Sequence, residues 1–177
     1  MLRAGTHAAA GAWPAEAAKG SIELDFEGRH RRRIRLATDT GVDVLLDLER
    51  ATAMADGDGV QADDGQWFRI SAKPEPLLAV TAPDAHGLLK LAWHLGNRHT
   101  PAEIQQGRIL IRRDHVLADM ARGLGGAVAE VVEPFQPEGS AYGGHGNAPA
   151  HNHGHGGHSH IHDHDHDHAH PHDHRHD

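Results

Sequence analysis

The end of the chain is the segment whose residue types most clearly suggest chemistry. Histidine occupies 13 of the 27 positions from His151 to Asp177, and most of the others are glycine or aspartate. Imidazole coordinates nickel, copper, zinc and iron while staying largely neutral near pH 7. The run from His162 to His168 also supplies carboxylates that offset the charge of an incoming dication. We interpret the segment as a metal-binding tail. Its candidate ligands are His151, His153, His155, His158, His160, His162, His164, His166, His168, His170, His172, His174 and His176.

The composition of this tail does not rank the metals. Copper binds such sites with the highest raw affinity and nickel and zinc follow, so selectivity has to come from elsewhere. An expression tag is the alternative interpretation of the segment. A tag is normally an uninterrupted hexahistidine, whereas this run is irregular and contains Asp, Gly, Asn and Pro. We therefore favour a native metal-handling segment.

Length and composition limit the class of protein. The 177 residues suffice for one or two small domains and a tail. Asp and Glu number 25 against 17 Lys and Arg, a formal net charge of −8, so no nucleic-acid partner is expected. The absence of cysteine excludes disulfides, zinc ribbons and thiolate copper sites. It also fits a reducing compartment, and we expect the protein to be cytoplasmic.

The sequence contains no recognisable membrane or secretion signal. No apolar run approaches the roughly 18 residues of a membrane span, so no membrane association is expected. Residues 1–14 contain one basic residue and several alanines but no leucine-rich segment, which argues against a secretory signal. We predict that residues 1–20 form a flexible leader.

Residues 21–82 show the pattern of short strands. Ile22, Leu24 and Phe26 alternate with polar residues, as expected of a half-buried strand. Later apolar runs are separated by turns rich in Asp and Gly, as at residues 56–59 and 63–65. This spacing predicts a small all-β domain, a barrel or a sandwich, which we expect to dock other proteins.

Two helices are predicted beyond Pro83. Asp84 is a plausible N-cap, and apolar residues then recur at helical spacing up to Gly96. Asp114 is the plausible N-cap of a second helix that Gly123 ends. The apolar face predicted for this second helix consists of Val116, Leu117, Met120 and Ala121.

Strands are predicted around these helices, at residues 108–112 and 127–132. If residues 77–80 begin the series and another strand follows Asn97, the order is βαββαβ, the ferredoxin-like arrangement. The fold class is therefore α+β. The glycine-rich end can bury almost nothing and should be disordered. The predicted division of the chain is a leader at 1–20, a β domain at 21–82, a ferredoxin-like metal-binding and dimerisation domain at 83–144, and a tail at 145–177.

His99 is the candidate ligand in the ordered part of the chain. Gly96 and Asn97 would end the first helix, leaving Arg98 and His99 at an exposed turn. A histidine after a helix end is often only a surface or capping residue, but here it shares a chain with a metal-binding tail. One imidazole cannot hold a divalent ion tightly. A two-fold dimer axis at this point would supply two imidazoles.

Two other charged clusters favour structural interpretations. Asp56 and Asp58 lie in a segment reminiscent of a calcium loop, but position 12 is Trp67 where an EF-hand needs a glutamate, so turns are expected. The basic run at residues 29–33 is interpreted as a solvated hairpin arm or a protein-docking surface.

Four other histidines are not predicted to bind metal. His94 is expected to be structural or solvated. The other three lack clustered partners and are assigned no role; they are His7, His30 and His86.

Several short motifs, in order, resemble the E family of urease accessory proteins, which are nickel metallochaperones. The similarity extends from about Ser21 to the end of the chain. Its motifs are HisLeuGlyAsnArgHis (94–99), AspHisValLeuAlaAspMet (114–120), ProPheGlnProGlu (134–138), AlaTyrGly (141–143), the aspartates at 56–58 and 63–65, and the histidine-rich end.

This resemblance implies a nickel site that two subunits share. In the family, C-terminal domains pair head to head, and the role of the interfacial nickel ligand would fall on His99. A histidine after AlaTyrGly completes the shell, which points to His145. Some members have a second histidine pair, where this chain has Arg113 and His115. Since Arg113 would repel a dication, we do not expect an independent site there.

The resemblance also implies the partners and the activity. The protein would be a homodimer that collects Ni²⁺ and delivers it, through the urease accessory GTPase, to apo-urease. Zn²⁺ or Cu²⁺ could bind in vitro. A nickel or zinc buffer without a dedicated client is the alternative. An enzyme is not expected, because the sequence has neither HExxH nor a GxxxxGK[ST] loop, and catalysis needs a fixed ligand set with an open position.

Overall fold

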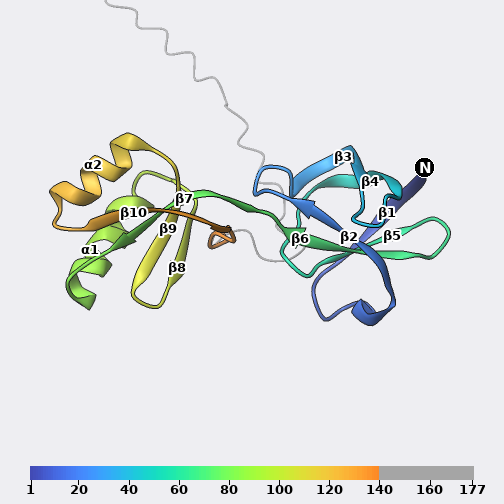
Figure 1. Ribbon diagram of the computed structural model, residues 1–177, viewed down its shortest axis with the longest axis horizontal. Helices are drawn as coiled ribbons and strands as arrows, with labels where there is room; N and C mark the ends of the chain where they lie inside the picture. The colour runs from blue at the N-terminus through green and yellow to red at the C-terminus, as the bar shows by residue number, and fades with distance from the viewer. Residues whose placement is uncertain (140–177) are drawn as a thin grey trace, which may run out of the picture. The chain divides into compact units, whose positions relative to one another are not determined.

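Two β-sheets, one of them with two helices, form the part of the chain that a computed structural model describes, residues 1–139 (Figure 1). The α+β class and the order of a β domain followed by a βαββαβ domain are confirmed. The predicted disordered tail lies outside the described residues. No helix in residues 1–139 is long and apolar enough to cross a membrane.

The first sheet has six strands in the order β2-β6-β5-β1-β4-β3, so β3 forms one of its edges. It is mixed, because β1 runs parallel to β4 and β2 runs parallel to β6, whereas the other neighbours are antiparallel. Its interior is a cluster of alternate apolar side chains that includes Val44, Leu46, Phe68 and Ile70. The elements are β1 (Leu2–Ala8), the short 3-10 helix η1 (Ala15–Ala17), β2 (Ala18–Leu24), β3 (His30–Ala37), β4 (Asp43–Ala53), β5 (Gly59–Ala62) and β6 (Trp67–Ala72).

The prediction of a flexible leader at residues 1–20 is wrong. Strand β1 lies between β4 and β5 in the middle of the first sheet, and its Ala4 is fully buried. Trp13 is buried too and stacks on Trp67, with ring centroids 5.4 Å apart. A Cβ on Gly59 would lie 2.4 Å from the Trp13 ring, so only glycine fits beneath it. These residues complete the sheet instead of preceding it.

The second sheet has four strands in the order β10-β7-β9-β8, and all its neighbours are antiparallel. The chain order is strand, helix, strand, strand, helix, strand, as predicted. The elements are β7 (Pro74–Thr81), α1 (Ala85–Gly96), β8 (Ala102–Gln105), β9 (Arg108–Arg112), α2 (His115–Gly123) and β10 (Ala127–Pro134).

The predicted boundary between residues 82 and 83 is also wrong. Strand β7 pairs with β9 and β10, so it belongs to the second sheet and not to the β domain before it. The first sheet ends with β6, and the boundary falls at Lys73 and Pro74. The proline pair at 74 and 76 therefore opens the second domain instead of closing the first.

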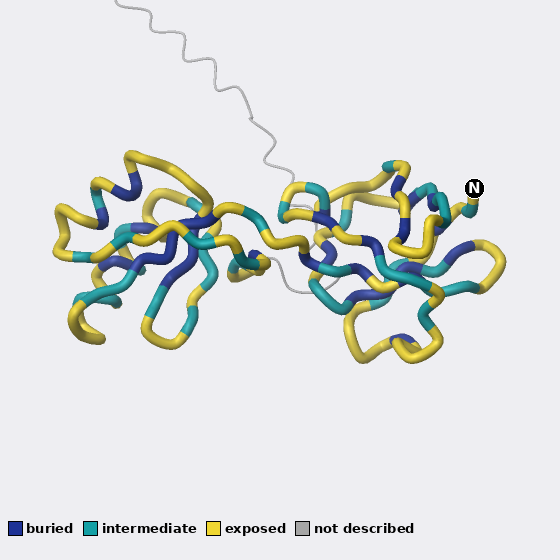
Figure 2. The backbone as a smooth tube through the Cα atoms, in the orientation of Figure 1, coloured by how far each residue is buried: buried dark blue, intermediate teal, exposed yellow. Residues whose placement is uncertain are grey.

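Both helices pack on one face of the second sheet, and both begin at the predicted caps. Asp84 accepts a hydrogen bond from the Gly87 amide at 2.7 Å, and Asp114 accepts one from the Leu117 amide at 3.0 Å. The core beneath them is the dark-blue backbone around β7 and β9 in Figure 2. One residue of the predicted α2 face is misplaced. Val116 is 60% exposed, and Ala118 is buried in the core beneath α2 instead.

Candidate metal centre

The turn after α1 holds His99 in an unusual conformation. The helix ends at Gly96, and the chain continues through two tight turns in which Arg98 donates to the Leu95 carbonyl and His99 to the Gly96 carbonyl, each at 3.0 Å. The Arg98 side chain also donates to the His94 carbonyl at 2.8 Å, which satisfies a free carbonyl at the helix end. These contacts leave His99 exposed, as predicted, with φ at 52°.

A positive φ at a histidine carries an energetic cost. The left-handed region brings Cβ close to the following carbonyl and costs roughly 1–2 kcal/mol for an L-residue other than glycine. Helix ends usually place glycine at such a position. His99 is the only non-glycine residue with a positive φ among residues 1–139. Strain of this kind clusters at functional sites, which points to a functional role for His99.

Among residues 1–139, the surroundings of His99 contain no other ligand set. Across the described part of the chain, no group of three or more His, Asp or Glu side chains is arranged to hold a metal ion. The neighbouring surface is apolar. Leu89 and Trp93 on α1 are 70% and 66% exposed, and Ile104 on β8 is exposed as well. A hollow of about 190 Å³ beside the turn includes Gly96, Thr100, Pro101 and Glu138 in its lining.

His94 has the structural surroundings that were predicted for it. The residue is half-buried, and its ring lies edge-on to Trp93 with centroids 4.9 Å apart. Its carbonyl receives the Arg98 side chain. His94 therefore contributes to the helix end.

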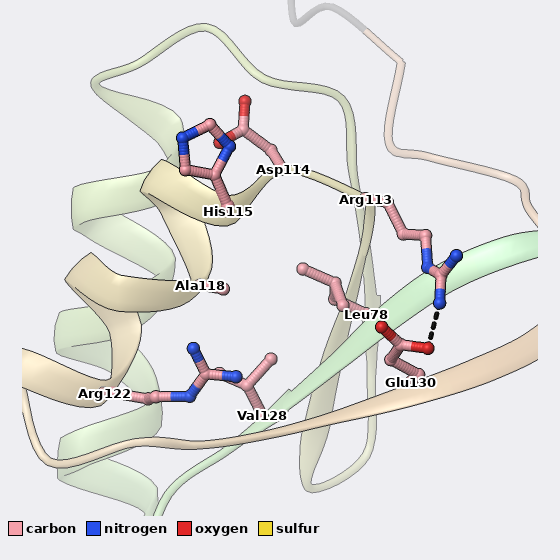
Figure 3. A pocket seen from close by; sticks show the side chains of 8 residues that line it. All are labelled: Leu78, Arg113, Asp114, His115, Ala118, Arg122, Val128 and Glu130. Carbon is pink, nitrogen blue, oxygen red and sulfur yellow. Dashed lines mark hydrogen bonds and ion pairs between the residues drawn. The ribbon is translucent and has the colours of Figure 1, made fainter.

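The position of the family's second histidine pair is occupied by an ion pair. Arg113 extends toward Glu130 on β10 and donates a hydrogen bond to it (Figure 3). Asp114 accepts the Leu117 amide as the cap of α2, and His115 is the exposed first residue of that helix. All four residues line a shallow pocket over α2 and β10. A guanidinium in that pocket disfavours a dication, which supports the prediction of no independent site.

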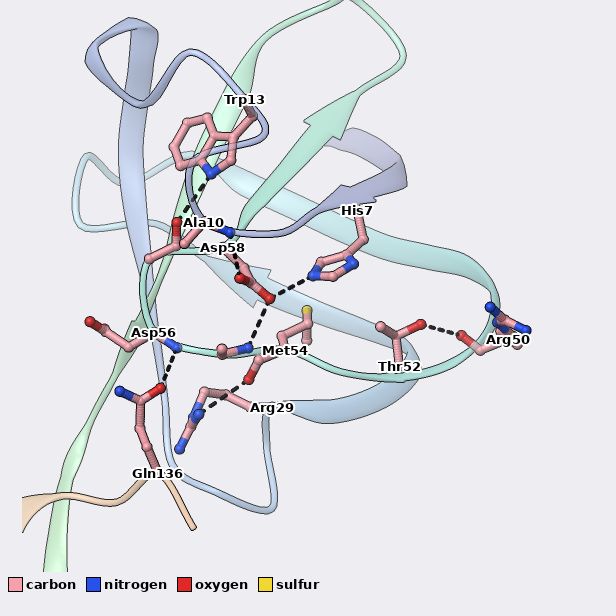
Figure 4. Close-up of polar contacts among 12 residues, drawn as sticks. His7, Ala10, Trp13, Arg29, Arg50, Thr52, Met54, Asp56, Asp58 and Gln136 are labelled. Carbon is pink, nitrogen blue, oxygen red and sulfur yellow. Dashed lines mark hydrogen bonds and ion pairs between the residues drawn. The ribbon is translucent and has the colours of Figure 1, made fainter. Parts of the chain in front are cut away.

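The Asp56–Asp58 segment is a structural turn. Asp58 is buried and accepts hydrogen bonds from the amides of Ala10 and Ala55 at 2.9 and 2.8 Å (Figure 4). It also lies 2.7 Å from Nε2 of His7, which must carry the hydrogen because a carboxylate can only accept. Asp56 accepts the Ala72 amide. The carboxylates are occupied by the fold, so turns are confirmed, and His7 has a partner that its isolated place in the sequence did not suggest.

The basic run at residues 29–33 divides into two parts. Residues 30–33 are exposed on or beside edge strand β3. Arg29 is only 4% exposed, so the interpretation of the whole run as a solvated arm or docking surface is wrong for this residue. No local pattern could have revealed its burial, because the carbonyl it reaches belongs to Phe135, far along the chain.

Comparison with known proteins agrees with this organisation. The model of the UreE urease accessory protein N-terminal domain matches residues 2–73, and that of the C-terminal domain matches residues 75–176. The chain belongs to the UreE urease accessory protein family. The family boundary coincides with the change of sheet between β6 and β7.

Relatives of known family support the assignment. The urease accessory protein UreE of Rhodopseudomonas palustris is 51% identical over 136 residues, which are 77% of this chain and 61% of the relative. That of a Bradyrhizobium species is 50% identical over 127 residues, 72% of this chain and 60% of the relative. The protein of a Chelativorans species is 50% identical over 125 residues, 71% and 79% of the two chains. The chain thus spans about three fifths of the length of the first two UreE proteins.

The remaining predicted ligands lie outside the described residues. They are His145 and the thirteen tail histidines from His151 to His176. The match to the UreE C-terminal domain continues to residue 176 and so includes their positions.

Proposed function

We propose that this protein collects Ni²⁺ and delivers it for assembly of the urease active site. Membership of the UreE urease accessory protein family supports urease as the protein that receives the nickel. The observation that carries the proposal for this chain is His99, an exposed imidazole that the fold holds in a strained conformation at the end of α1. The histidine-rich segment of the same chain supplies the capacity to gather metal.

The tight site is proposed to form between two subunits. One imidazole binds a dication weakly, and a two-fold axis beside His99 would bring a second one to the same ion. The exposed apolar side chains of Leu89 and Trp93 on α1 supply a surface that a second copy could bury. His145 is proposed to complete the ligand shell of this shared ion.

The tail is proposed to gather nickel at weaker sites. Histidines at i and i+2 of an extended segment lie on the same side about 7 Å apart, close enough for the chain to fold both onto one ion. Binding both histidines to one ion fixes the backbone between them, which costs conformational entropy and weakens binding. Weaker binding suits a carrier, since its ligands have to release the ion again. The tail would thereby raise the nickel concentration near His99.

Delivery is proposed to proceed by ligand exchange with partner proteins in the cytoplasm. The partners would be the urease accessory GTPase and, through it, apo-urease. Nickel is cargo in this scheme, and the protein acts as a carrier and not as an enzyme. Zn²⁺ and Cu²⁺ are expected to bind imidazole sites in vitro as well.

Urease activity in cells that lack this protein tests the proposal. A carrier is needed most when nickel is scarce, so activity should be low in these cells and should recover when nickel is added to the medium. The protein with His99→Ala should restore less activity at low nickel than the unaltered protein. Full urease activity in the deleted cells at limiting nickel would contradict the proposal.

A nickel or zinc buffer without a dedicated client is the second candidate. The capacity of the tail favours it, because many histidines on one chain can hold several ions. Affinity capture from cells under nickel limitation separates the two functions. A carrier should retain the urease maturation proteins, whereas a buffer should retain none of them.

A further inference from the structure

The segment that follows β10 forms a strap, Phe135–Glu138, across the second sheet. Phe135 is fully buried and packs on Leu77, Ala79 and Leu110, on the face that the helices leave free. Its ring meets that of Phe26 edge-on, with centroids 5.4 Å apart. The strap therefore has its own apolar anchor.

Polar contacts attach the strap to the first domain. Oε1 of Gln136 accepts the Asp56 amide at 2.9 Å (Figure 4). The Arg29 guanidinium donates to the Phe135 carbonyl and, at 3.1 Å, to the Met54 carbonyl. Arg29 thus links the strap to the turn that also contains Asp56.

Burying Arg29 is costly, which indicates that its position matters. Desolvation lowers the pKa of the guanidinium, and carboxylates around it, Glu75 first, oppose the shift. The Nε–H of Arg29 has no hydrogen-bond acceptor among the described residues. An unpaired buried donor costs about 1–3 kcal/mol. The fold tolerates this cost at the residue that holds the start of the strap.

The other end of the strap reaches the surroundings of His99. The Gln136 amide donates to Glu103 at 2.7 Å, and the Glu138 amide donates to the Ala102 carbonyl at 2.9 Å. Ala102 follows His99 by only three residues, and Glu138 lines the hollow beside that turn. The strap consequently brings the chain to the His99 turn just before residue 140.

We propose that Arg29 is a positioning residue for metal transfer, because it fixes the strap whose end at Glu138 lies beside the His99 turn. This inference rests on the proposed function. His145 follows Glu138 by seven residues, a reach of at most about 25 Å. A short tether starting beside the site gives a high effective concentration of tail-bound metal, and the concentration falls roughly as the −3/2 power of tether length.

The rate at which His99 receives metal from the tail tests this inference. Trp93 lies six residues before His99 and is exposed, so bound Ni²⁺ should quench its fluorescence. The full chain is mixed with less than one Ni²⁺ per dimer in a stopped-flow instrument. The His99→Ala variant gives the fluorescence change that occurs when no Ni²⁺ binds at His99.

Three changes should slow the His99-dependent phase. Arg29→Met removes the hydrogen bond to the Phe135 carbonyl. Full release of the strap back to Pro134 would slow the phase about twofold, so this variant should slow it by up to that factor. Glu138→Pro removes the amide that binds Ala102 without altering Arg29. A spacer of about 20 flexible residues inserted after Gly139 leaves the fold intact and should slow the phase about eightfold.

Matched controls separate positioning from general damage. Arg31→Met removes an exposed arginine of the same run, and an equal spacer appended after Asp177 adds length without moving the anchor. Both should leave the rate unchanged. An unchanged rate with Arg29→Met, with the spacer after Gly139 or with Glu138→Pro would overturn the inference while leaving the carrier function standing. Absence of any His99-dependent quenching in the unaltered protein would overturn the proposed function itself.

Discussion

His7 and His99 show how differently the two domains use the same side chain. His7 in β1 is half-buried and contacts Asp58, which also accepts two backbone amides. His99 is exposed and held at a positive φ after α1. His7 stabilises the fold through a hydrogen bond, whereas the backbone conformation of His99 lowers the stability of the fold.

This difference distinguishes a polar group that the fold uses from one that we propose to bind metal. A carboxylate such as Asp58, whose oxygens are occupied by internal donors, has little capacity left for a cation. By contrast, no hydrogen bond within residues 1–139 occupies the exposed imidazole of His99. Variants of the Asp58 cluster and of the His99 turn test this contrast.

Loss of the tight metal site is the largest expected effect. His99→Ala should abolish the one tight Ni²⁺ per dimer, because it removes both proposed interfacial imidazoles, and it should leave the weaker tail sites in place. Deleting residues 146–177 should do the opposite, lowering stoichiometry while the tight ion remains. Titration calorimetry on the two variants measures both quantities.

His86→Ala is the matched control for this prediction, since His86 is an exposed histidine in the first turn of α1. It should bind nickel as the unaltered protein does. A truncated protein without any tight site would contradict the assignment of His99.

Removal of the Asp58 carboxylate should be the largest change in stability. Asp58→Ala leaves the amides of Ala10 and Ala55 and the His7 ring without their acceptor, which should lower the free energy of unfolding by about 3 kcal/mol. Urea denaturation of the metal-free protein measures this. The exposed Asp63, changed to alanine in the same way, should cost less than about 0.5 kcal/mol. A loss of the tight nickel ion with Asp58→Ala in the folded protein would show that the two regions are not separate.

His99→Gly should stabilise the fold while removing the metal site. Glycine adopts a positive φ without a Cβ clash, so the free energy of unfolding should rise by about 1 kcal/mol. His99→Ala retains the clash and should give no such gain. Thermal unfolding of the metal-free variants makes the comparison. Equal stability of the glycine and alanine variants would mean that the backbone at His99 is not strained.

The smallest expected effect concerns the stability of the first domain at acidic pH. A hydrogen bond from Arg3, together with the charge of Arg33, lowers the pKa of Asp47. A folded-state pKa below the unfolded value of about 3.9 stabilises the fold above that pH, and this contribution disappears as the pH falls through the folded value. In the Asp47→Asn variant, the free energy of unfolding should therefore fall less steeply with pH below about pH 5. Above that pH, its dependence on pH should be nearly the same as in the unaltered protein. Unfolding free energies measured from pH 7 to pH 3 check the difference.

Local patterns predicted most of the elements in this molecule. The helix caps Asp84 and Asp114 were recognisable because a cap acts within three residues of its own position. Alternation identified β2, where Ile22 and Leu24 are buried, and a short apolar run identified β9, where three successive residues are buried. Strand β1 was missed because its buried Ala4 is small and the strand depends on pairing with β4, some 40 residues away.

The site was predictable in position but not in conformation. The motif around His99 placed it at an exposed helix end, yet the positive φ results from turns that close only in the folded chain. Burial of Arg29 depends on carbonyls of Met54 and Phe135, and such distant partners leave no trace in a local pattern. Val116 was wrongly assigned to the buried face of α2, because hydrophobicity alone favours valine over Ala118, the residue that is buried there.

The arginines of edge strand β3 affect how neighbouring molecules can meet. A free sheet edge exposes amides and carbonyls to which a second copy could add a strand, and this is a route to fibrous aggregates. Arg31, Arg33 and Arg35 recur along this edge, and all three are exposed. The positive charges of two such edges would repel each other, so two molecules are kept from pairing edge to edge into a continuous sheet.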